Sequence, residues 1–233
     1  MGTLILLRHG RSSANSAGVL AGRSPGVGLD EHGCAQATAL VEHLAELPLV
    51  AIVSSPLQRC RETVATLART RGLEIAHDDR FIEVDYGQWT GRELRKLGKE
   101  PLWKVVQSHP SAAVFPGGEG LAAMAARAIA AVREWDAKLV AEHGPTALWL
   151  VCTHGDVVKA ILADALGMHL DGFQRIVVNP GSISAVSYTE TRPFVHRIND
   201  SGGDLRSLLP PKRARHRRSQ SSDAAVGGST GTV

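Results

Sequence analysis

Two histidines stand where apolar runs of this 233-residue sequence end. His9 follows the aliphatic residues 4–7 and Arg8, and His154 comes soon after the apolar residues 147–152. Short, continuous apolar runs predict strands that are buried on both faces. Ligands bind at the carboxyl ends of strands in open α/β sheets. If the two strands are neighbours, both histidines lie at one sheet edge, where we expect His9 to act as a nucleophile.

Two arginines follow the same pattern and favour an anionic ligand. Arg8 ends the first apolar run, and Arg59 lies just after another strand and in the first turns of a predicted helix. Arginine binds phosphate through two parallel hydrogen bonds, and a helix N-terminus attracts anions. Taken alone, each residue is equally well explained as a solvated surface group. Together with His9 and His154 they predict a cationic pocket for a phosphoryl group, whose transfer depends on positioning and charge neutralisation.

The order of predicted elements indicates the fold. Apolar runs predict strands over residues 4–7, 51–55, 73–76, 146–153, 175–178, 182–189 and 193–198. Helical spacing, with proline and glycine stop signals, predicts helices over about 31–47, 56–72, 92–97, 102–108, 121–143 and 157–167. Residues 11–30 are predicted to be a loop. We expect an α/β fold, a three-layer α/β/α sandwich whose mainly parallel sheet carries helices on both faces and a small helical cap over its C-terminal edge.

Composition and charge limit the classes of protein to which this sequence can belong. No apolar run approaches the roughly 18 residues of a membrane span, and the N-terminus lacks a signal-peptide pattern. Three cysteines without a C-x-x-C pair favour a reduced, cytoplasmic protein without a membrane partner. The net charge is +3, but residues 210–233 alone carry +4. We therefore predict a basic, low-complexity disordered tail over 210–233, and any attraction to nucleic acid belongs to that tail.

Four segments, taken in order, carry a family resemblance. They are Leu7-Arg8-His9-Gly10 with Asn15, Ser-Ser-Pro-Leu-x-Arg59 with Thr63, Glu83 with Gly87, Trp89 and Gly91, and Thr153-His154-Gly155. In this arrangement the chain resembles the histidine phosphatase superfamily, the phosphoglycerate mutase-like group in which the catalytic glutamate is distant from the second histidine. The resemblance implies a phosphatase domain over residues 1–209, with a cap insertion at about 84–121.

The resemblance also implies a role for each matching position. His9 would carry the phosphoryl group, and Arg8, Arg59 and His154 would bind its oxygens. Asn15, Gly22 and Gly155 would line the substrate pocket, and no metal or other cofactor would be needed. The other histidines show no ligand spacing, which agrees with a site without metal.

Glu83 would be the general acid and then the base that activates water. A general acid must keep its proton near neutral pH, which requires a raised pKa. Burial and the substrate phosphate would raise this pKa and a cationic pocket would lower it, and the sequence leaves that balance open. Asp85 is the reserve candidate for the acid. In the acid-phosphatase branch the donor directly follows the second histidine, but here Gly155 does, and Asp156 comes one residue later.

Three functions remain open at this stage. Mutases of the family resemble one another in an arginine after the catalytic glutamate and a paired arginine in the cap, and neither is found in residues 83–89 or 99–115. We therefore predict a phosphomonoester phosphatase acting on a small phosphorylated metabolite. A cofactor-dependent phosphoglycerate mutase and a non-catalytic phosphate-binding protein are the alternatives. The cap side chains either line the substrate pocket or pack against the core; they are Trp103, His109 and Phe115. Glu119 either stabilises the start of the following helix or takes part in the site. A late strand at the sheet edge allows a homodimer.

Overall fold

The computed structural model of the protein describes residues 2–202, and the predicted basic tail lies outside them. The strands are β1 (Thr3–Arg8), β2 (Leu49–Ser54), β3 (Ile75–His77), β4 (Leu148–Thr153), β5 (Ile183–Tyr188) and β6 (Pro193–Asp200). The α-helices are α1 (Ser13–Ala17), α2 (Glu31–His43), α3 (Gln58–Arg71), α4 (Leu94–Leu97), α5 (Pro101–Ser108), α6 (Leu121–His143) and α7 (Gly155–Ala165). Short 3₁₀ helices are η1 (Asp79–Phe81), η2 (Gly87–Trp89), η3 (Pro110–Ala112) and η4 (Leu170–Arg175).

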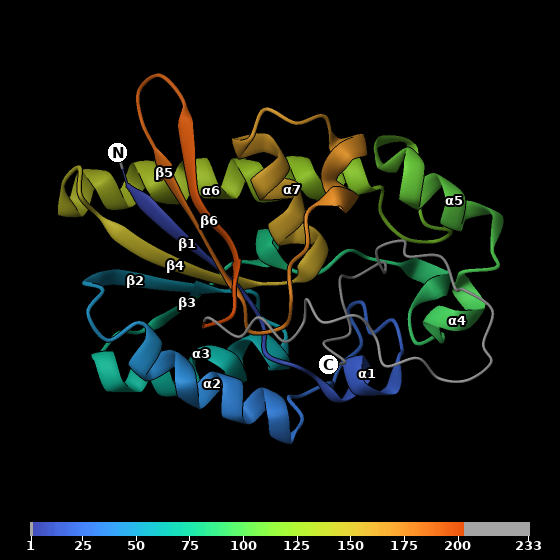
Figure 1. Cartoon of the computed structure of the whole chain (residues 1–233), viewed down its shortest axis with the longest axis horizontal. Coiled ribbons are helices and arrows are strands. Elements are labelled where there is room, and N and C mark those ends of the chain that lie inside the picture. The colour runs from blue at the N-terminus through green and yellow to red at the C-terminus, as the bar shows by residue number, and fades with distance from the viewer. Residues whose placement is uncertain (1, 203–233) are drawn as a thin grey trace.

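These strands form one mixed sheet in the order β3-β2-β4-β1-β5-β6 (Figure 1). Strands β3, β2, β4 and β1 run parallel, β5 pairs antiparallel with β1, and β6 pairs antiparallel with β5 at that side of the sheet. The helices between the parallel strands are the crossover connections that parallel pairing requires. The predicted α/β class with a mainly parallel sheet is confirmed.

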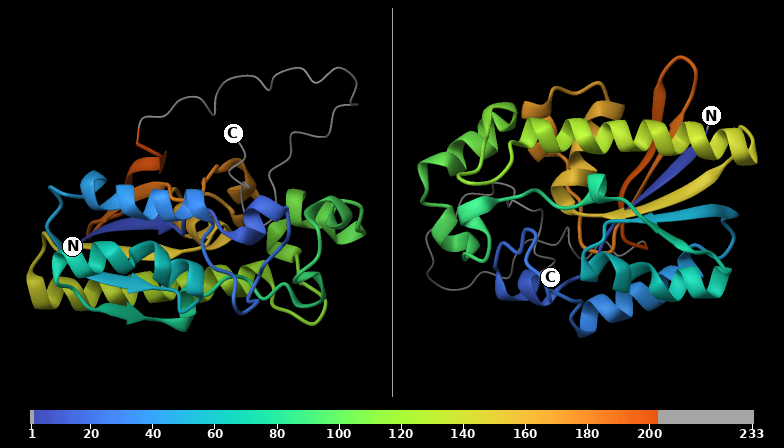
Figure 2. Two further views of the ribbon diagram at one scale, coloured as in Figure 1. Left: turned by 90° about the horizontal axis from the view of Figure 1, so that it is seen from below. Right: turned by 180° about the vertical axis from the view of Figure 1, so that it is seen from behind.

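Alternation along the strands separates the two faces of the sheet. In β1, Leu4 and Leu6 belong to the apolar cluster that also contains residues of α6 and α7. Ile5 and Leu7 belong to the cluster with residues of α2 and α3. Figure 2 shows these helix pairs on opposite sides of the sheet. Burial of each leucine stabilises the fold by about 1.5–3 kcal/mol, so β1 is packed on both faces up to Leu7, the residue before Arg8.

The register between β1 and β4 positions the two histidines. Arg8 pairs with Thr153, so His9 and His154 leave the sheet side by side. The His9 amide donates to the Thr153 carbonyl at 2.9 Å and continues the ladder one step further. Helices α4 and α5 lie beyond this carboxyl edge of the parallel strands (Figure 1).

Two local predictions are wrong. Residues 175–178 form no strand. Arg175 ends η4 and residues 176–178 are irregular, and the Val178 carbonyl accepts a hydrogen bond from the Arg8 guanidinium at 2.7 Å. The predicted loop over 11–30 contains α1, which is only five residues long and has Ala14 as its one buried residue. An apolar triplet and a short polar helix carry too little periodicity to be distinguished from sequence. Within residues 2–202, no helix is long and apolar enough to span a bilayer.

Candidate active site

Arg59 lies at the centre of the site and contacts both histidines. Its Nε donates to His9 Nε2 at 3.2 Å, and one terminal nitrogen lies 3.1 Å from His154 Nδ1. The same terminal nitrogen donates to the carbonyl of Gly22 at 2.9 Å. The other terminal nitrogen is buried and has no hydrogen-bond partner within residues 2–202. A buried guanidinium with an unused donor fits an anion, because an unsatisfied buried charge is costly.

His9 has its reactive nitrogen facing Arg59. Its Nδ1 lies 2.7 Å from the Gly10 carbonyl, an acceptor, so Nδ1 carries the ring proton and Nε2 presents its lone pair. Burial, together with the positive charges of Arg59 and Arg8, lowers the pKa of His9 well below its usual value. The imidazole is therefore neutral at physiological pH, which a nitrogen nucleophile requires. Thr63 stabilises the turn at His9 and Gly10, since its Oγ1 accepts a hydrogen bond from the Gly10 amide at 2.9 Å.

His154 lies against His9 with the ring centroids 5.2 Å apart and the planes at 62°. Arg59 can only donate, so His154 Nδ1 accepts and Nε2 donates to Ser55 Oγ at 2.8 Å. Burial, followed by the positive charge of Arg59, lowers the pKa of His154 well below its usual value. The imidazole of His154 is therefore neutral at physiological pH.

Arg8 completes the cationic set from the end of β1. It is fully buried, and its guanidinium donates to the Val178 carbonyl. Burial lowers the pKa of Arg8 to about 10, against the opposing charges of Glu83 and Asp156. The side chain thus stays protonated at neutral pH. The structure brings Arg8, His9, Arg59 and His154 together as the sequence predicts.

Glu83 faces this cationic group across a short distance. Its Oε2 lies 4.0 Å from His154 Nδ1, and its Oε1 accepts from the Val84 amide at 3.0 Å. Burial, followed by the negative charge of Asp156, raises the pKa of Glu83 to about 7, although Arg59 and Arg8 oppose the shift. A carboxyl group with this pKa can donate a proton and take one back near neutral pH. Its geometry suits the predicted acid and base.

The main chain of Glu83 is fixed by two arginines. Arg23 Nε and Arg127 donate to its carbonyl at 2.8 Å and 3.2 Å. Glu119 binds both guanidiniums, at 2.8 Å and 2.6 Å, and accepts from the Asp85 amide at 3.0 Å. Burial opposes ionisation of Glu119, but the hydrogen bond from Arg127 holds its pKa below the usual range. Glu119 therefore belongs to a network that positions the Glu83 main chain, a role that the sequence left undecided.

The predicted substrate-lining residues have different surroundings. Gly22 is part of the site, because its carbonyl binds Arg59. Gly155 is buried at the first position of α7, directly after His154. Asn15 instead caps α1, since its Oδ1 accepts from the backbone amide and the hydroxyl of Ser12 at 3.0 Å and 2.9 Å. A substrate role for the three stays a prediction.

Aromatic residues of the cap mostly pack. Phe115 is buried and makes edge contacts with Tyr86 and Trp89, with centroids 4.9 Å and 5.3 Å apart. Trp103 stacks on Trp89 at 6.2 Å. His109 is exposed next to the end of α5. These contacts favour the packing interpretation for Phe115 and Trp103. Within the described part of the chain, no group of three or more histidine, cysteine or acidic side chains could hold a metal ion.

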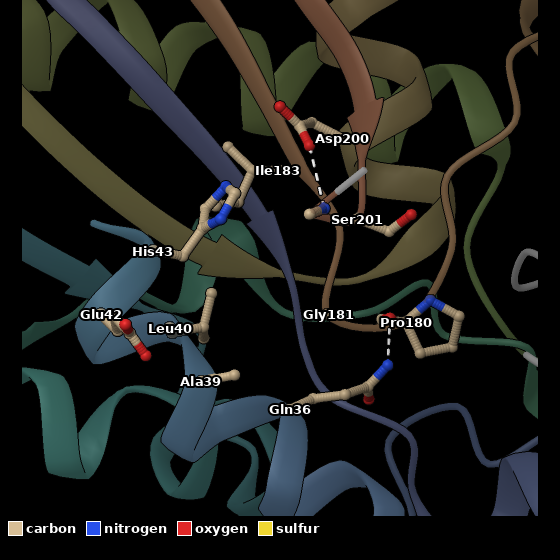
Figure 3. Close-up of a pocket in the computed structure, with 11 residues that line it drawn as sticks. Gln36, Ala39, Leu40, Glu42, His43, Pro180, Gly181, Ile183, Asp200 and Ser201 are labelled. Carbon is tan, nitrogen blue, oxygen red and sulfur yellow. Dashed lines mark hydrogen bonds between the residues drawn. The ribbon is translucent and has the colours of Figure 1, made fainter. Parts of the chain in front are cut away.

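A separate cleft of about 360 Å³ lies next to the turn at His9 and Gly10, between α2 and the start of β5 (Figure 3). Gln36 bridges its wall by donating to the Pro180 carbonyl at 2.8 Å and accepting from the Arg11 amide at 2.8 Å. The Gly181 amide donates to the His9 carbonyl at 3.0 Å. The described lining includes none of Arg8, His9, Arg59 and His154, so this cleft is separate from the candidate active site.

The fold and this site belong to a known class. The family model of the histidine phosphatase superfamily (branch 1) matches residues 4–201, and the chain belongs to that family. The predicted superfamily and branch are confirmed. The family, together with the relatives described next, supports the conclusion that this protein is a hydrolase acting on phosphomonoesters.

Particular relatives narrow the comparison. Phosphoserine phosphatase 1 of Hydrogenobacter thermophilus is 30% identical over 204 residues, which cover 84% of this chain and 91% of the relative. A probable phosphoglycerate mutase of Proteus mirabilis is 27% identical, covering 87% and 93%. The structure of a mycobacterial glucosyl-3-phosphoglycerate phosphatase in complex with VO3 is similar with a TM-score of 0.75 and 26% identity, covering 85% and 98%.

Proposed function

We propose that this protein is a phosphatase that hydrolyses small phosphorylated metabolites through a phosphohistidine at His9. The observation that carries the proposal is the position of Arg59, which touches both imidazoles and keeps a buried donor unused. A phosphoryl group between His9 and His154 would take over the hydrogen bond that Arg59 Nε now makes to the nucleophilic nitrogen. Binding of the anion would therefore also free the Nε2 lone pair of His9 for attack.

The chemistry then needs two steps. His9 Nε2 attacks phosphorus in line while the bond to the leaving oxygen breaks, and the Glu83 carboxyl gives its proton to that oxygen. The resulting alcohol leaves. The Glu83 carboxylate then takes a proton from water as the water attacks phosphorus and the P–N bond breaks. Phosphate is released, and free His9 and protonated Glu83 are restored. Arg8, Arg59 and a protonated His154 would neutralise the charge on the transferred group in both steps.

Water is favoured over a second substrate oxygen as the acceptor. A mutase must hold a phosphoglycerate while the phosphoryl group returns to a different oxygen, which calls for a further anion clamp beside the glutamate. Arg23 and Arg127 lie beside Glu83, but Glu119 already binds both guanidiniums. The phosphoglycerate mutase function stays the weaker alternative.

Phosphate release from a panel of metabolites tests the proposal. The panel contains O-phosphoserine, sugar phosphates and 2- and 3-phosphoglycerate, each assayed with and without a chelator. We expect hydrolysis that resists the chelator and an acid-labile, alkali-stable phosphoryl label on the wild type that His9→Ala abolishes. Faster interconversion of the phosphoglycerates than phosphate release would identify a mutase instead. Equal phosphate release by wild type and His9→Ala would leave only a binding function.

A further inference from the structure

Ser55 carries a fully buried hydroxyl that the mechanism above does not use. Its Oγ lies 2.8 Å from His154 Nε2. The other ring nitrogen of His154, Nδ1, faces the site, because it lies 3.1 Å from a terminal nitrogen of Arg59 and 4.0 Å from Glu83 Oε2. The imidazole of His154 is thus held by the Arg59 guanidinium at one nitrogen and by a neutral hydroxyl at the other.

The main chain fixes Ser55 in this position. Its amide donates to the Cys152 carbonyl at 2.9 Å, which continues the pairing of β2 with β4 one residue past the end of β2. Its carbonyl accepts from the Ser54 hydroxyl at 2.8 Å. The next residue is Pro56, and proline favours extended backbone at the residue before it. Both polar backbone groups of Ser55 are therefore bonded, so its hydroxyl is a rigid partner for His154.

Cys60 also lies near Nε2 of His154, but it is a weaker partner than Ser55. The Cys60 Sγ is 3.5 Å from Nε2, and its thiol donates to the Thr153 carbonyl at 3.7 Å. Sulfur is a weak acceptor, whereas a hydroxyl oxygen offers two lone pairs. The second lone pair of Ser55 Oγ accepts from the Leu57 amide, the N-cap residue of α3, at 3.4 Å. Ser55 is therefore the stronger acceptor for a proton on Nε2.

These hydrogen bonds determine where the protons of His154 lie. An arginine only donates, so Nδ1 bears a lone pair while Arg59 contacts it, and the single ring proton is on Nε2 and is donated to Ser55. A phosphoryl oxygen only accepts, so a phosphoryl group beside His154 requires a proton on Nδ1. Because the Ser55 oxygen holds the proton on Nε2, a proton that the ring gains when the anion binds goes to Nδ1.

We propose that Ser55 is a positioning residue whose hydroxyl accepts the Nε2 proton of His154 in the free and in the phosphate-bound site, so that the proton gained with phosphate lies on Nδ1 and faces the ligand. The inference rests on the proposed phosphatase function, because that function supplies the phosphoryl group. Ser55 acts on this group only through the orientation and the protonation of His154.

The ¹⁵N NMR spectrum of histidine-labelled protein at pH 7 tests this assignment, with the His154 signals identified through His154→Gln. In the free wild type we expect a protonated Nε2 and an unprotonated Nδ1. With saturating inorganic phosphate, both nitrogens should be protonated. Ser55→Ala removes the acceptor and leaves a buried N–H without its partner, so phosphate should instead give a ring with a proton on Nδ1 alone.

Phosphate affinity and turnover measure the size of the effect. Ser55→Ala should raise the dissociation constant of inorganic phosphate and lower kcat/KM for an alkyl phosphomonoester by about tenfold each, as expected for one lost hydrogen bond to a charged group. Ser55→Cys has nearly the size of serine and a weaker acceptor, so it should lie between wild type and Ser55→Ala, and it serves if Ser55→Ala folds poorly. Ser184→Ala is the matched control, since it removes a buried hydroxyl of β5 that accepts from the Asn199 amide at 3.1 Å, and it should change neither value.

The NMR result separates this inference from the proposed function. An Nε2 that loses its proton in phosphate-bound wild type refutes the role of Ser55 even in an active phosphatase, as does a phosphate-bound Ser55→Ala spectrum that overlays the wild type. Cys60→Ala should keep the wild-type Nε2 signal, and loss of the Nε2 proton there would assign the acceptor to sulfur and overturn the proposal. A His154 spectrum that phosphate leaves unchanged refutes both proposals. The expected spectra in a protein that hydrolyses none of the panel support the role of Ser55 and refute the phosphatase function.

Discussion

Replacing Arg59 with lysine is expected to reduce kcat/KM for phosphomonoesters by about 10²–10³ while the fold is retained. The guanidinium bridges His9 Nε2, His154 Nδ1 and the Gly22 carbonyl at 2.9–3.2 Å. Lysine preserves the positive charge but ends in a single nitrogen that cannot reach three partners in a fixed plane. The substitution therefore isolates the geometry of the group from its charge.

The magnitude follows from the bonds that are lost. With phosphate bound, Arg59 would offer the phosphoryl group its Nε, released from His9, and its unused terminal nitrogen, and a lysine ammonium that cannot reach this plane would lose both charge-assisted hydrogen bonds, each worth about 1.5–3 kcal/mol. Taking about 3–4 kcal/mol of lost transition-state stabilisation, at about 1.4 kcal/mol for each factor of ten, gives the stated range. Removal of one preorganised donor from an oxyanion site typically has a similar effect.

Phosphate release at pH 6–7 and a thermal unfolding curve for each variant measure the effect. Arg61→Lys is the matched control, since Arg61 lies two residues along α3 and is exposed. It should stay within about twofold of wild type, as surface substitutions usually do. An Arg59→Lys enzyme within threefold of wild type would refute the argument that Arg59 organises the site.

Four more substitutions probe other parts of the argument. Glu83→Gln should lower kcat on alkyl phosphates by about 10²–10⁴ and much less on p-nitrophenyl phosphate, whose leaving group needs no proton; equal losses would contradict its role as acid. Gly22 has φ at +51°, and a Cβ added there would lie 2.9 Å from Thr90 Oγ1. Gly22→Ala should therefore move the carbonyl that binds Arg59 and lower kcat/KM about tenfold. Gly26→Ala, with φ at +73° and open space, should lose only about 1 kcal/mol of stability in urea unfolding. Leu150→Ala, fully buried in β4, should cost about 2–5 kcal/mol in the same assay, and a smaller loss would mean that the sheet relaxes around it.

The cationic residues that meet at the sheet edge could be predicted from the sequence. His9 and His154 follow apolar runs, and such runs predict buried parallel strands whose carboxyl ends meet. Arg59 follows a strand and opens a helix, which places it at the same edge. The long periodic helix was predicted with the bounds it has in the structure, Leu121–His143, because it is the segment with the clearest period and stop signal.

The protonation and orientation of these residues depended on the tertiary structure. The register that aligns Arg8 with Thr153 sets the distance between the imidazoles, and no local pattern specifies a register between strands about 145 residues apart. The Arg23–Glu119–Arg127 network and the Asp156–Tyr86 hydrogen bond join segments that are far apart in the sequence, and no shared motif or spacing links those segments. A pKa is set by burial and by all charges around a group, so the state of Glu83 follows only once the chain has brought those charges together. The sequence by itself thus determined which groups meet at the sheet edge, and the folded structure decided which of them carries the proton.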